Sequence, residues 1–334
     1  MCIGKQMEGK AIYSRIRSTG SALPARCVTN EELAQSLARR GIETSDEWIR
    51  TRTGIRQRYL ASGTETTLTL ALSAAARALE AGRVAAGGID LVIVATTTPD
   101  QIFPAVAARL QAGLGIPPCA AFDLQAVCSG FAYALSVADS MIRSGAATRA
   151  LIVGADTLSR VIDWSDRSSC VLFGDGAGAV VLERSDEPGI LATELAADGG
   201  KAGILYADGR VEGGRLQGSG FLVMDGRAVF KEAVTSLQET ARQALERAGL
   251  EAGAIDWYIP HQANIRIMSF VAEKLGIPEQ RMVATVGLHG NTCAASVPLA
   301  LDAAVRDGRV KRGDALLLQG VGAGMTCAAA VLRF

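Results

Sequence analysis

Histidine is scarce in this 334-residue chain, which has only two, and aromatic residues make up just 5% of it. Its seven cysteines are scattered from Cys2 to Cys327 and form no C-x-x-C pair. The odd number and the scatter argue against a disulfide framework, and the missing pairs argue against a zinc site. We therefore expect no bound metal and a reducing compartment, which indicates the cytoplasm.

An excess of charge of either sign is also missing, because Lys plus Arg and Asp plus Glu each number 34. Without an overall field to hold a polyanion, we expect no nucleic-acid partner, and an acidic partner must meet a local basic patch. No apolar run approaches the roughly 18 residues of a spanning helix, and Met1–Gln6 lacks the apolar core of a signal peptide. Membrane insertion is therefore not expected.

What the chain does have is a globular composition, with 49% hydrophobic and 20% charged residues. Its length allows two packed halves or one large α/β unit. Short apolar runs, typical of strands buried on both faces, alternate with alanine-rich stretches at helical spacing, which predicts a layered α/β fold. Strands are expected at Leu91–Ala95, Ala150–Val153 and Ala315–Leu318, and helices at Leu68–Leu79, Phe131–Ile142 and Val234–Ala248.

The two halves of the chain resemble each other. Residues 76–93 and 243–259 both combine a helical pattern ending in glycine with Ile-Asp and an apolar strand. Each half also closes with a glycine-rich turn that feeds a strand. The repeat favours a duplicated fold with halves 1–185 and 186–334, joined by the turn at 185–189, and a site at their junction. Chance repetition of a common α/β pattern is the alternative.

Cys128 stands between a predicted strand, Phe122–Val127, and the start of a predicted helix. A helix N-terminus presents unpaired N–H groups and the positive end of the helix dipole, which favour a thiolate and lower the pKa of a thiol from about 8.5. Cys128 is therefore the candidate nucleophile. Four other cysteines are expected to be small buried side chains: Cys2, Cys27, Cys119 and Cys170.

Two further polar side chains lie at predicted strand-to-helix junctions. His261 follows the strand Trp257–Pro260 and precedes the amphipathic run Ile265–Leu275. Asn291 lies in the turn after His289, and its amide donates two hydrogen bonds without titrating.

Cysteine, histidine and asparagine at three separate junctions suit acyl transfer at a thioester. A thiolate at Cys128 would attack the thioester carbonyl, while His261 and Asn291 would stabilise charge on a second carbonyl as a carbanion forms. An oxyanion hole could use the backbone N–H of Cys128 together with one from the turn at 322–324, where Ala323 lies.

Four stretches carry a resemblance: residues 44–55 (TSDEWIRTRTGI), the Cys128 turn, residues 261–264 (HQAN), and residues 290–292 (GNT) with 294–298 (AASVP). Together they resemble the β-ketoacyl-acyl carrier protein synthase III family, over nearly the whole chain. The resemblance implies a thiolase fold, an α/β fold of duplicated five-layered αβαβα architecture, and a homodimer.

The same resemblance implies a reaction that initiates fatty acid synthesis. Cys128 would take an acyl group from an acyl-coenzyme A primer. Malonyl-acyl carrier protein would then lose carbon dioxide, and its carbanion would attack the acyl-enzyme to give 3-oxoacyl-acyl carrier protein. His261 and Asn291 would polarise the malonyl thioester carbonyl. Coenzyme A enters as part of a substrate, and no cofactor is implied.

Binding residues follow from the resemblance as well. Positions matching Trp48, Arg52 and Arg167 hold the nucleotide end of coenzyme A by stacking and cation contacts. The docking patch for the acidic carrier protein is expected at three basic positions: Lys231, Arg266 and Lys274. A solvated helix face explains the last two nearly as well, because they belong to one helical row.

The acyl pocket is where the chain departs from the family pattern. Phe103 matches the aromatic that reaches into the partner's acyl pocket. Val321 stands where a bulky aromatic is usual, Ala323 replaces a glycine, and Gly287-Leu288 replaces Asp-Arg. Because losing the aromatic reshapes the pocket beside Cys128, the primer could be longer or more branched than acetyl.

Other interpretations stay open. A same-fold acyltransferase acting on a small amine or alcohol, or a condensing enzyme of a quinolone or polyketide pathway, would also use Cys128. Elongating synthases are disfavoured, since they use two histidines where this chain offers Asn291. Degradative thiolases need a glycine-rich sequence after a late cysteine, which Cys327 lacks. A catalytically inactive scaffold is disfavoured, because packing alone does not require Cys128, His261 and Asn291 together.

Overall fold

The computed structural model describes residues 11–334. The sequence-based predictions for Met1–Gln6 and Cys2 therefore lie outside the described residues. Within that range, no helix is both long and apolar enough to cross a membrane. No group of three or more His, Cys, Asp or Glu side chains in this range is placed to hold a metal ion.

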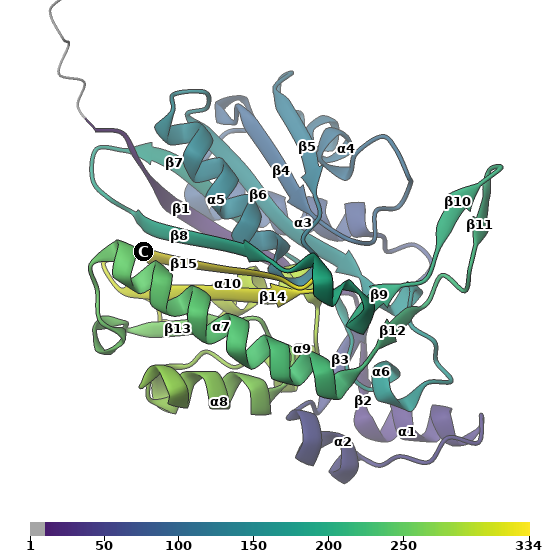
Figure 1. Ribbon diagram of the computed structural model, residues 1–334. Helices are drawn as coiled ribbons and strands as arrows, with labels where there is room; N and C mark the ends of the chain where they lie inside the picture. Colours follow the sequence, from purple (N-terminus) through teal and green to yellow (C-terminus); the bar gives the residue numbers. More distant parts are fainter. Residues whose placement is uncertain (1–10) are drawn as a thin grey trace, which may run out of the picture.

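Two mixed sheets form the centre of the molecule (Figure 1). The first is built from β1 (Tyr13–Ala22), β4 (Leu91–Ala95), β5 (Ala120–Leu124), β6 (Arg149–Thr157) and β7 (Asp175–Ser185), in the order β1-β7-β6-β4-β5. The second is built from β8 (Ile190–Ala197), β13 (Trp257–Pro260), β14 (Ala315–Gly322) and β15 (Thr326–Arg333), in the order β13-β14-β15-β8.

The second sheet repeats the first. In the first, β4 runs parallel to β6, while β7 is antiparallel to both β6 and β1. In the second, β13 runs parallel to β14, while β15 is antiparallel to both β14 and β8. The counterpart of β5 is reduced to one parallel bridge between Tyr258 and Met282. The duplication expected from the sequence is therefore confirmed as topology, while 1–185 and 186–334 as separate domains stay a prediction.

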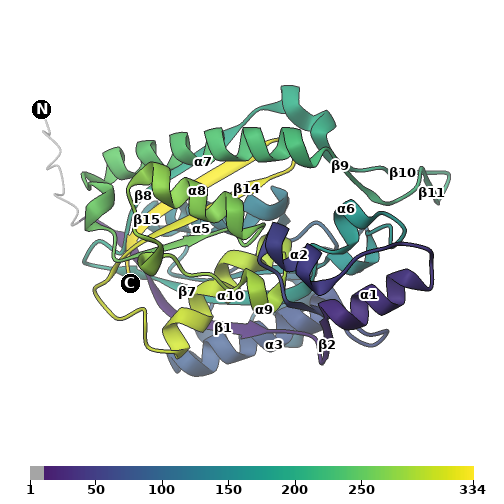
Figure 2. The same ribbon diagram turned by 90° about the horizontal axis from the view of Figure 1, so that it is seen from below.

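Helices complete five layers. The outer helices are α3 (Thr67–Gly82) and α4 (Val106–Gly113) on the first sheet, and α7 (Gly226–Ala248) and α8 (Ile265–Leu275) on the second; the central pair is α5 (Gly130–Arg143) and α10 (Ser296–Arg306). Both central helices contact both sheets. Figure 2 shows α7 on one outer face and α3 on the opposite one, with the sheets and the central helices between them.

Small residues let the central layer approach the sheets closely. A Cβ atom at Gly154 of β6 would lie 2.2 Å from the carbonyl oxygen of Ala294, which is shorter than any tolerated contact. Strand β4 of the same sheet is buried along its whole length, as expected for a strand covered by helices on both faces. The tight contact at Gly154 fixes the turn before α10 directly against the first sheet.

The remaining elements cap one end of the sandwich. They are β2 (Arg26–Thr29), β3 (Gln57–Leu60), α1 (Asn30–Ala38), α2 (Asp46–Thr53), α6 (Arg167–Cys170), α9 (Val286–His289), and the hairpin segment with β9 (Leu205–Ala207), β10 (Arg210–Glu212), β11 (Arg215–Gln217) and β12 (Leu222–Met224). Two short 3-10 turns matter for the site, η2 (Val127–Ser129) and η7 (Cys293–Ala295). In Figure 1 the β10–β11 hairpin projects away from the body.

Two local predictions need correction. The strand expected over Phe122–Val127 ends at Leu124, because the chain turns into η2 before α5. The helix expected from Val234 begins at Gly226, where the Asp225 carboxylate caps it by accepting hydrogen bonds from two backbone N–H groups. Polar residues in those first turns hid this start from the apolar pattern.

The prediction that four cysteines are buried holds only in part. Cys170 is buried, but Cys119 is only partly buried and Cys27 is exposed. Cys27 lies on the short strand β2, where only Val28 is buried. The neighbouring Val28 points inward instead.

Candidate active site

Cys128 lies in η2, at the entry to α5, in the position that the sequence predicts. The preceding residue, Val127, has φ of 48°, an uncommon conformation for a β-branched residue. Such strain is typical of turns that present a functional side chain. Cys128 itself is only 7% exposed, so its sulfur faces an enclosed space rather than bulk water.

His261 follows β13 and is buried. Its backbone N–H donates to the carbonyl of Gln319, 2.7 Å away on β14. Its Nδ1 atom is paired with the hydroxyl of Ser296, at 2.6 Å, so the ring is held from α10. With Nδ1 engaged, Nε2 is the ring nitrogen left to act on a ligand.

Asn291 is also buried, in the turn between α9 and η7. Its Oδ1 accepts a hydrogen bond from the backbone N–H of Cys293 at 3.0 Å. This bond fixes which way the amide faces, and Nδ2 makes no hydrogen bond to another described residue. The amide N–H groups are therefore available to a carbonyl oxygen.

The three side chains meet at one cavity of about 530 Å³. Cys128, His261 and Asn291 all line it, although they come from three separate parts of the sequence. Other predicted site residues on its wall are Trp48, Arg52, Arg266, Val321 and Ala323. The cavity is thus the junction between the two halves that the internal repeat predicts.

A second cysteine stands beside the candidate nucleophile. The Sγ atoms of Cys128 and Cys293 lie 3.6 Å apart. The hydrogen bond between the two sulfurs lowers the pKa of Cys128 to about 5, and the nearby His261 ring adds to the effect against the opposing effect of burial. Burial raises the pKa of Cys293 well above its ordinary value. No local sequence pattern indicates this pair, because its members are 165 residues apart.

Asp156, at the end of β6, is another buried group that sequence reasoning missed. Its Oδ1 accepts hydrogen bonds from Thr97 and Thr98, and its Oδ2 accepts one from the backbone N–H of Ala294 at 3.0 Å. Burial raises the pKa of this carboxyl group despite those donors. Asp156 therefore ties the turn after β4 to η7, and so aligns the two halves around the cavity.

Strand β14 passes directly behind the Cys128 turn. A Cβ atom at Gly322 would lie 2.7 Å from the carbonyl oxygen of Ala126 and 2.8 Å from the backbone nitrogen of Cys128. Only glycine permits this approach. It brings Ala323, in the turn after β14, and Val321 to the same cavity wall as the sulfur.

The guanidinium groups of two arginines lie over the Trp48 ring. The guanidinium carbon of Arg52 lies 4.5 Å from the centre of the Trp48 ring, and that of Arg167 lies 4.7 Å from it. Both contacts have cation–π geometry. Arg167 also donates to the carbonyl of Glu43 and does not line the cavity itself.

The three predicted docking cations belong to neighbouring helices. Lys231 lies on α7, whereas Arg266 and Lys274 lie on α8. Arg266 alone lines the cavity. Phe270 lies beside Lys274, whose ammonium is 5.3 Å from its ring centre, and it packs edge-on against Phe230 of α7. The cations therefore lie at the side of the cavity formed by α7 and α8.

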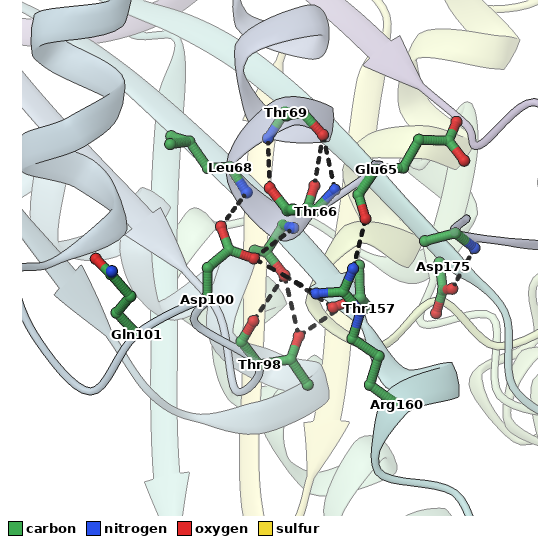
Figure 3. Close-up of polar contacts among 12 residues, drawn as sticks. Glu65, Thr66, Leu68, Thr69, Thr98, Asp100, Gln101, Thr157, Arg160 and Asp175 are labelled. Atoms are coloured by element: carbon green, nitrogen blue, oxygen red, sulfur yellow. Dashed lines mark hydrogen bonds and ion pairs between the residues drawn. The ribbon is translucent and has the colours of Figure 1, made fainter. Parts of the chain in front are cut away.

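Phe103 does not line this chain's own cavity; its side chain is 81% exposed. The segment that carries it is nevertheless anchored (Figure 3). Asp100 accepts hydrogen bonds from the backbone N–H groups of Thr67 and Leu68 at the start of α3, and Arg160 lies 3.8 Å from the same carboxylate. Phe103 is thus an exposed aromatic side chain that follows the anchored residue Asp100.

Comparison with known proteins agrees with this fold. The family models for 3-oxoacyl-[acyl-carrier-protein] synthase III match residues 122–199 and, for its C-terminal part, 245–334. The chain is 45% identical to the 3-oxoacyl-[acyl-carrier-protein] synthase III of Aquifex aeolicus VF5, over 96% of this chain and 100% of that one, with a TM-score of 0.90.

Two further solved structures are similar to this chain. It is 41% identical to 3-oxoacyl-(acyl carrier protein) synthase III of Pseudomonas aeruginosa PAO1, over 96% of this chain and 98% of that one, with a TM-score of 0.90. It is also 39% identical to the priming β-ketosynthase from the R1128 polyketide biosynthetic pathway, over 99% of both chains, again with a TM-score of 0.90.

The duplicated five-layered fold with a cavity at its junction defines a condensing enzyme of the thiolase fold, an acyltransferase. Within that class, the chain belongs to the 3-oxoacyl-[acyl-carrier-protein] synthase III family.

Proposed function

We propose that this enzyme condenses an acyl-coenzyme A primer with malonyl-acyl carrier protein to give 3-oxoacyl-acyl carrier protein, coenzyme A and carbon dioxide. The observation that carries the proposal is the meeting of Cys128, His261 and Asn291 at one cavity of about 530 Å³. Family membership indicates the class of reaction, and the positions of Cys128, His261 and Asn291 suggest the individual steps. Both substrates place the reaction in the cytoplasm.

In the first half-reaction, the Cys128 thiolate attacks the primer's thioester carbonyl. The carbonyl oxygen takes up negative charge, which the backbone N–H groups of Cys128 and Ala323 stabilise. Coenzyme A then leaves as its thiolate, and the acyl group stays on Cys128. Trp48, Arg52 and Arg167 hold the nucleotide end: a base displaces one guanidinium group from the Trp48 ring and stacks there, and the cations contact phosphates.

In the second half-reaction, malonyl-acyl carrier protein enters the same cavity. Its thioester carbonyl accepts hydrogen bonds from Nε2 of His261 and Nδ2 of Asn291, which stabilise the enolate left when the C–C bond to carbon dioxide breaks. This role requires the Ser296 hydroxyl, 2.6 Å from Nδ1, to donate to that nitrogen, which keeps the proton on Nε2. The enolate carbon attacks the acyl carbonyl, and the Cys128 thiolate leaves. No step needs a cofactor.

The carrier protein is acidic, so its docking surface must be basic. Lys231, Arg266 and Lys274 supply cations on the α7–α8 side of the cavity. The acyl chain lies beside Val321, and Phe103 reaches into the acyl pocket of a second subunit in a homodimer. With no bulky aromatic at Val321, the pocket suits a primer longer or more branched than acetyl.

A second candidate function is priming in a specialised pathway. The 39% identity to a priming ketosynthase of a polyketide pathway favours this alternative, because the same chemistry would start a different product. A same-fold transfer of the acyl group to a small amine or alcohol is a further version of it.

The deciding experiment uses acyl-coenzyme A thioesters of two to ten carbons and reads the intact mass of the protein. Addition of malonyl-acyl carrier protein should then remove the added mass and release 3-oxoacyl-acyl carrier protein. An acyl mass that persists after this addition contradicts the proposed acceptor and supports the specialised alternative. The thioester that loads fastest identifies the primer.

A further inference from the structure

Cys293 takes no part in the steps proposed above, yet its sulfur is the nearest polar partner of the nucleophile. The two Sγ atoms are 3.6 Å apart and hydrogen-bonded, with the Cys128 thiol as donor while both sulfurs are protonated. Once Cys128 is a thiolate, Cys293 holds the only proton of the pair, and the bond can run only toward Cys128. Cys128 comes from η2 in the first half of the chain, and Cys293 comes from η7 in the second. Cys293 is completely buried, so no water competes for this contact.

Two hydrogen bonds hold the turn that carries Cys293. Its backbone N–H donates to Oδ1 of Asn291, and the next N–H, of Ala294, donates to Asp156. Its φ of 51° lies in the left-handed region that non-glycine residues seldom adopt. A strained residue held in this way is typical of functional turns. The thiol is therefore placed against Cys128 by the fold and does not reach it by chance rotation.

The surroundings assign different charge states to the two sulfurs. The positive end of α5 and the His261 ring favour a thiolate at Cys128. Burial and the neighbouring carboxylate of Asp156 disfavour a thiolate at Cys293. When the pair holds a single negative charge, that charge therefore belongs on Cys128, and the proton stays on Cys293.

We propose that the Cys293 thiol donates a hydrogen bond to the Cys128 sulfur and thereby stabilises the nucleophilic thiolate. This inference rests on the proposed role of Cys128. Two other acceptors lie near the Cys293 thiol. They are Thr97, whose Oγ1 is 3.8 Å from the sulfur, and the Asp156 carboxylate, whose oxygens already accept hydrogen bonds from Thr97, Thr98 and the backbone N–H of Ala294. A charged sulfur accepts a hydrogen bond more strongly than a neutral hydroxyl, so the thiolate is the preferred partner.

The same hydrogen bond serves both half-reactions. It stabilises Cys128 before the primer arrives, and it stabilises the thiolate that leaves when condensation releases the acyl group. Between these points Cys128 is a neutral thioester and a weaker acceptor. No covalent bond to Cys293 forms or breaks, and its proton is not transferred.

The test is the pH dependence of Cys128 alkylation by iodoacetamide, read by peptide mass spectrometry with a phosphine reductant present. In the native protein the thiolate already dominates above pH of about 5, so alkylation changes little between pH 6 and 8. Cys293→Ala removes the donor and should raise the pKa of Cys128 by about one unit. Alkylation near pH 5 then falls up to about tenfold, while rates at high pH converge.

Two matched variants sharpen the result. Cys293→Gly also removes the donor but accepts a φ of 51° without strain, so it replaces the alanine variant should that fail to fold. Cys293→Ser keeps a donor and should move the profile less than either. The backbone N–H that holds Asn291 survives in all three. Cys170→Ala, which truncates a buried cysteine that does not line the cavity, should leave the profile unchanged.

An unchanged Cys128 profile in folded Cys293→Ala or Cys293→Gly protein would overturn the inference, because the thiol would then be packing alone. Alkylation requires neither acyl-coenzyme A nor malonyl-acyl carrier protein. Failure of the native protein to load acyl groups would therefore contradict the proposed function and leave this measurement readable.

Discussion

Two of the proposed catalytic side chains, His261 and Asn291, each have one polar group held by the protein and one left for the substrate. The imidazole of His261 is held at Nδ1 by Ser296, and the amide of Asn291 is held at Oδ1 by a backbone N–H. The chain thus fixes both orientations before a substrate arrives, which lowers the cost of ordering them in the transition state.

Because Asn291 acts only on the malonyl carbonyl, its loss should separate the two half-reactions. Asn291→Ala should load an acyl group onto Cys128 at close to the native rate, whereas condensation should fall about 10²–10³-fold, the usual cost of one oxyanion donor. Intact mass measures the first step, and release of 3-oxoacyl-acyl carrier protein measures the second.

Cys128→Ser is the reference for this comparison and should show no acyl mass gain. Should folded Asn291→Ala protein fail to form the acyl-enzyme, the assignment of Asn291 to the second half-reaction is wrong.

At the scale of elements, the site depends on close backbone contacts between segments far apart in sequence. Strand β14 lies against the Cys128 turn at Gly322, and β6 lies against the turn before α10 at Gly154. Both contacts leave no room for a side chain. They hold the Cys128 turn against β14 and η7 against β6.

Gly322→Ala should therefore impair catalysis without unfolding the protein. The added methyl group meets backbone atoms of Ala126 and Cys128, which cannot move aside like a flexible side chain, so the turn must shift. Displacements of about 1 Å near reacting groups cost on the order of 10²-fold in rate. Steady-state kcat, compared with a thermal melt, checks this expectation.

Gly87→Ala is the matched control, because a Cβ atom there meets no other atom within 4 Å. It should keep native activity. If Gly322→Ala is as active as this control, β14 does not constrain the nucleophile as the packing indicates.

At the scale of the whole molecule, an apolar surface remains on the single chain. Phe103 and its neighbour Ile102 are 81% and 75% exposed, on a segment anchored to α3. A pair of large apolar side chains exposed to solvent is typical of an interface. The proposed homodimer would cover it and bring Phe103 to the partner's acyl pocket.

Light scattering should accordingly give about twice the chain mass of 34.8 kDa. Phe103→Ala should keep the dimer but change the order in which acyl-coenzyme A thioesters load, because the partner's acyl pocket gains room. Leu288→Ala, which truncates another exposed apolar side chain, serves as the control and should leave the order unchanged. A monomer, or an unaltered order in the Phe103 variant, would contradict this arrangement.

Several features of this protein could be predicted from the sequence because they depend on residues that are close together in the chain. The apolar run at β4 could only be a strand buried on both faces, and the start of α5 placed Cys128 where a thiolate is favoured. The repeat between the halves predicted two matching sheets, which the topology confirms. These features depend on neighbouring residues, and so they are visible in the sequence alone.

Only the tertiary structure decided what surrounds the nucleophile. Cys293 and Asp156 carry no local signal, since one lies in a small-residue turn and the other ends an apolar strand. Their effect comes from contacts across the two halves, where burial and a few ångströms decide which sulfur is charged. The sequence determined the elements and the position of the proposed nucleophile, whereas the packing of the two halves determined the electrostatic surroundings of that sulfur.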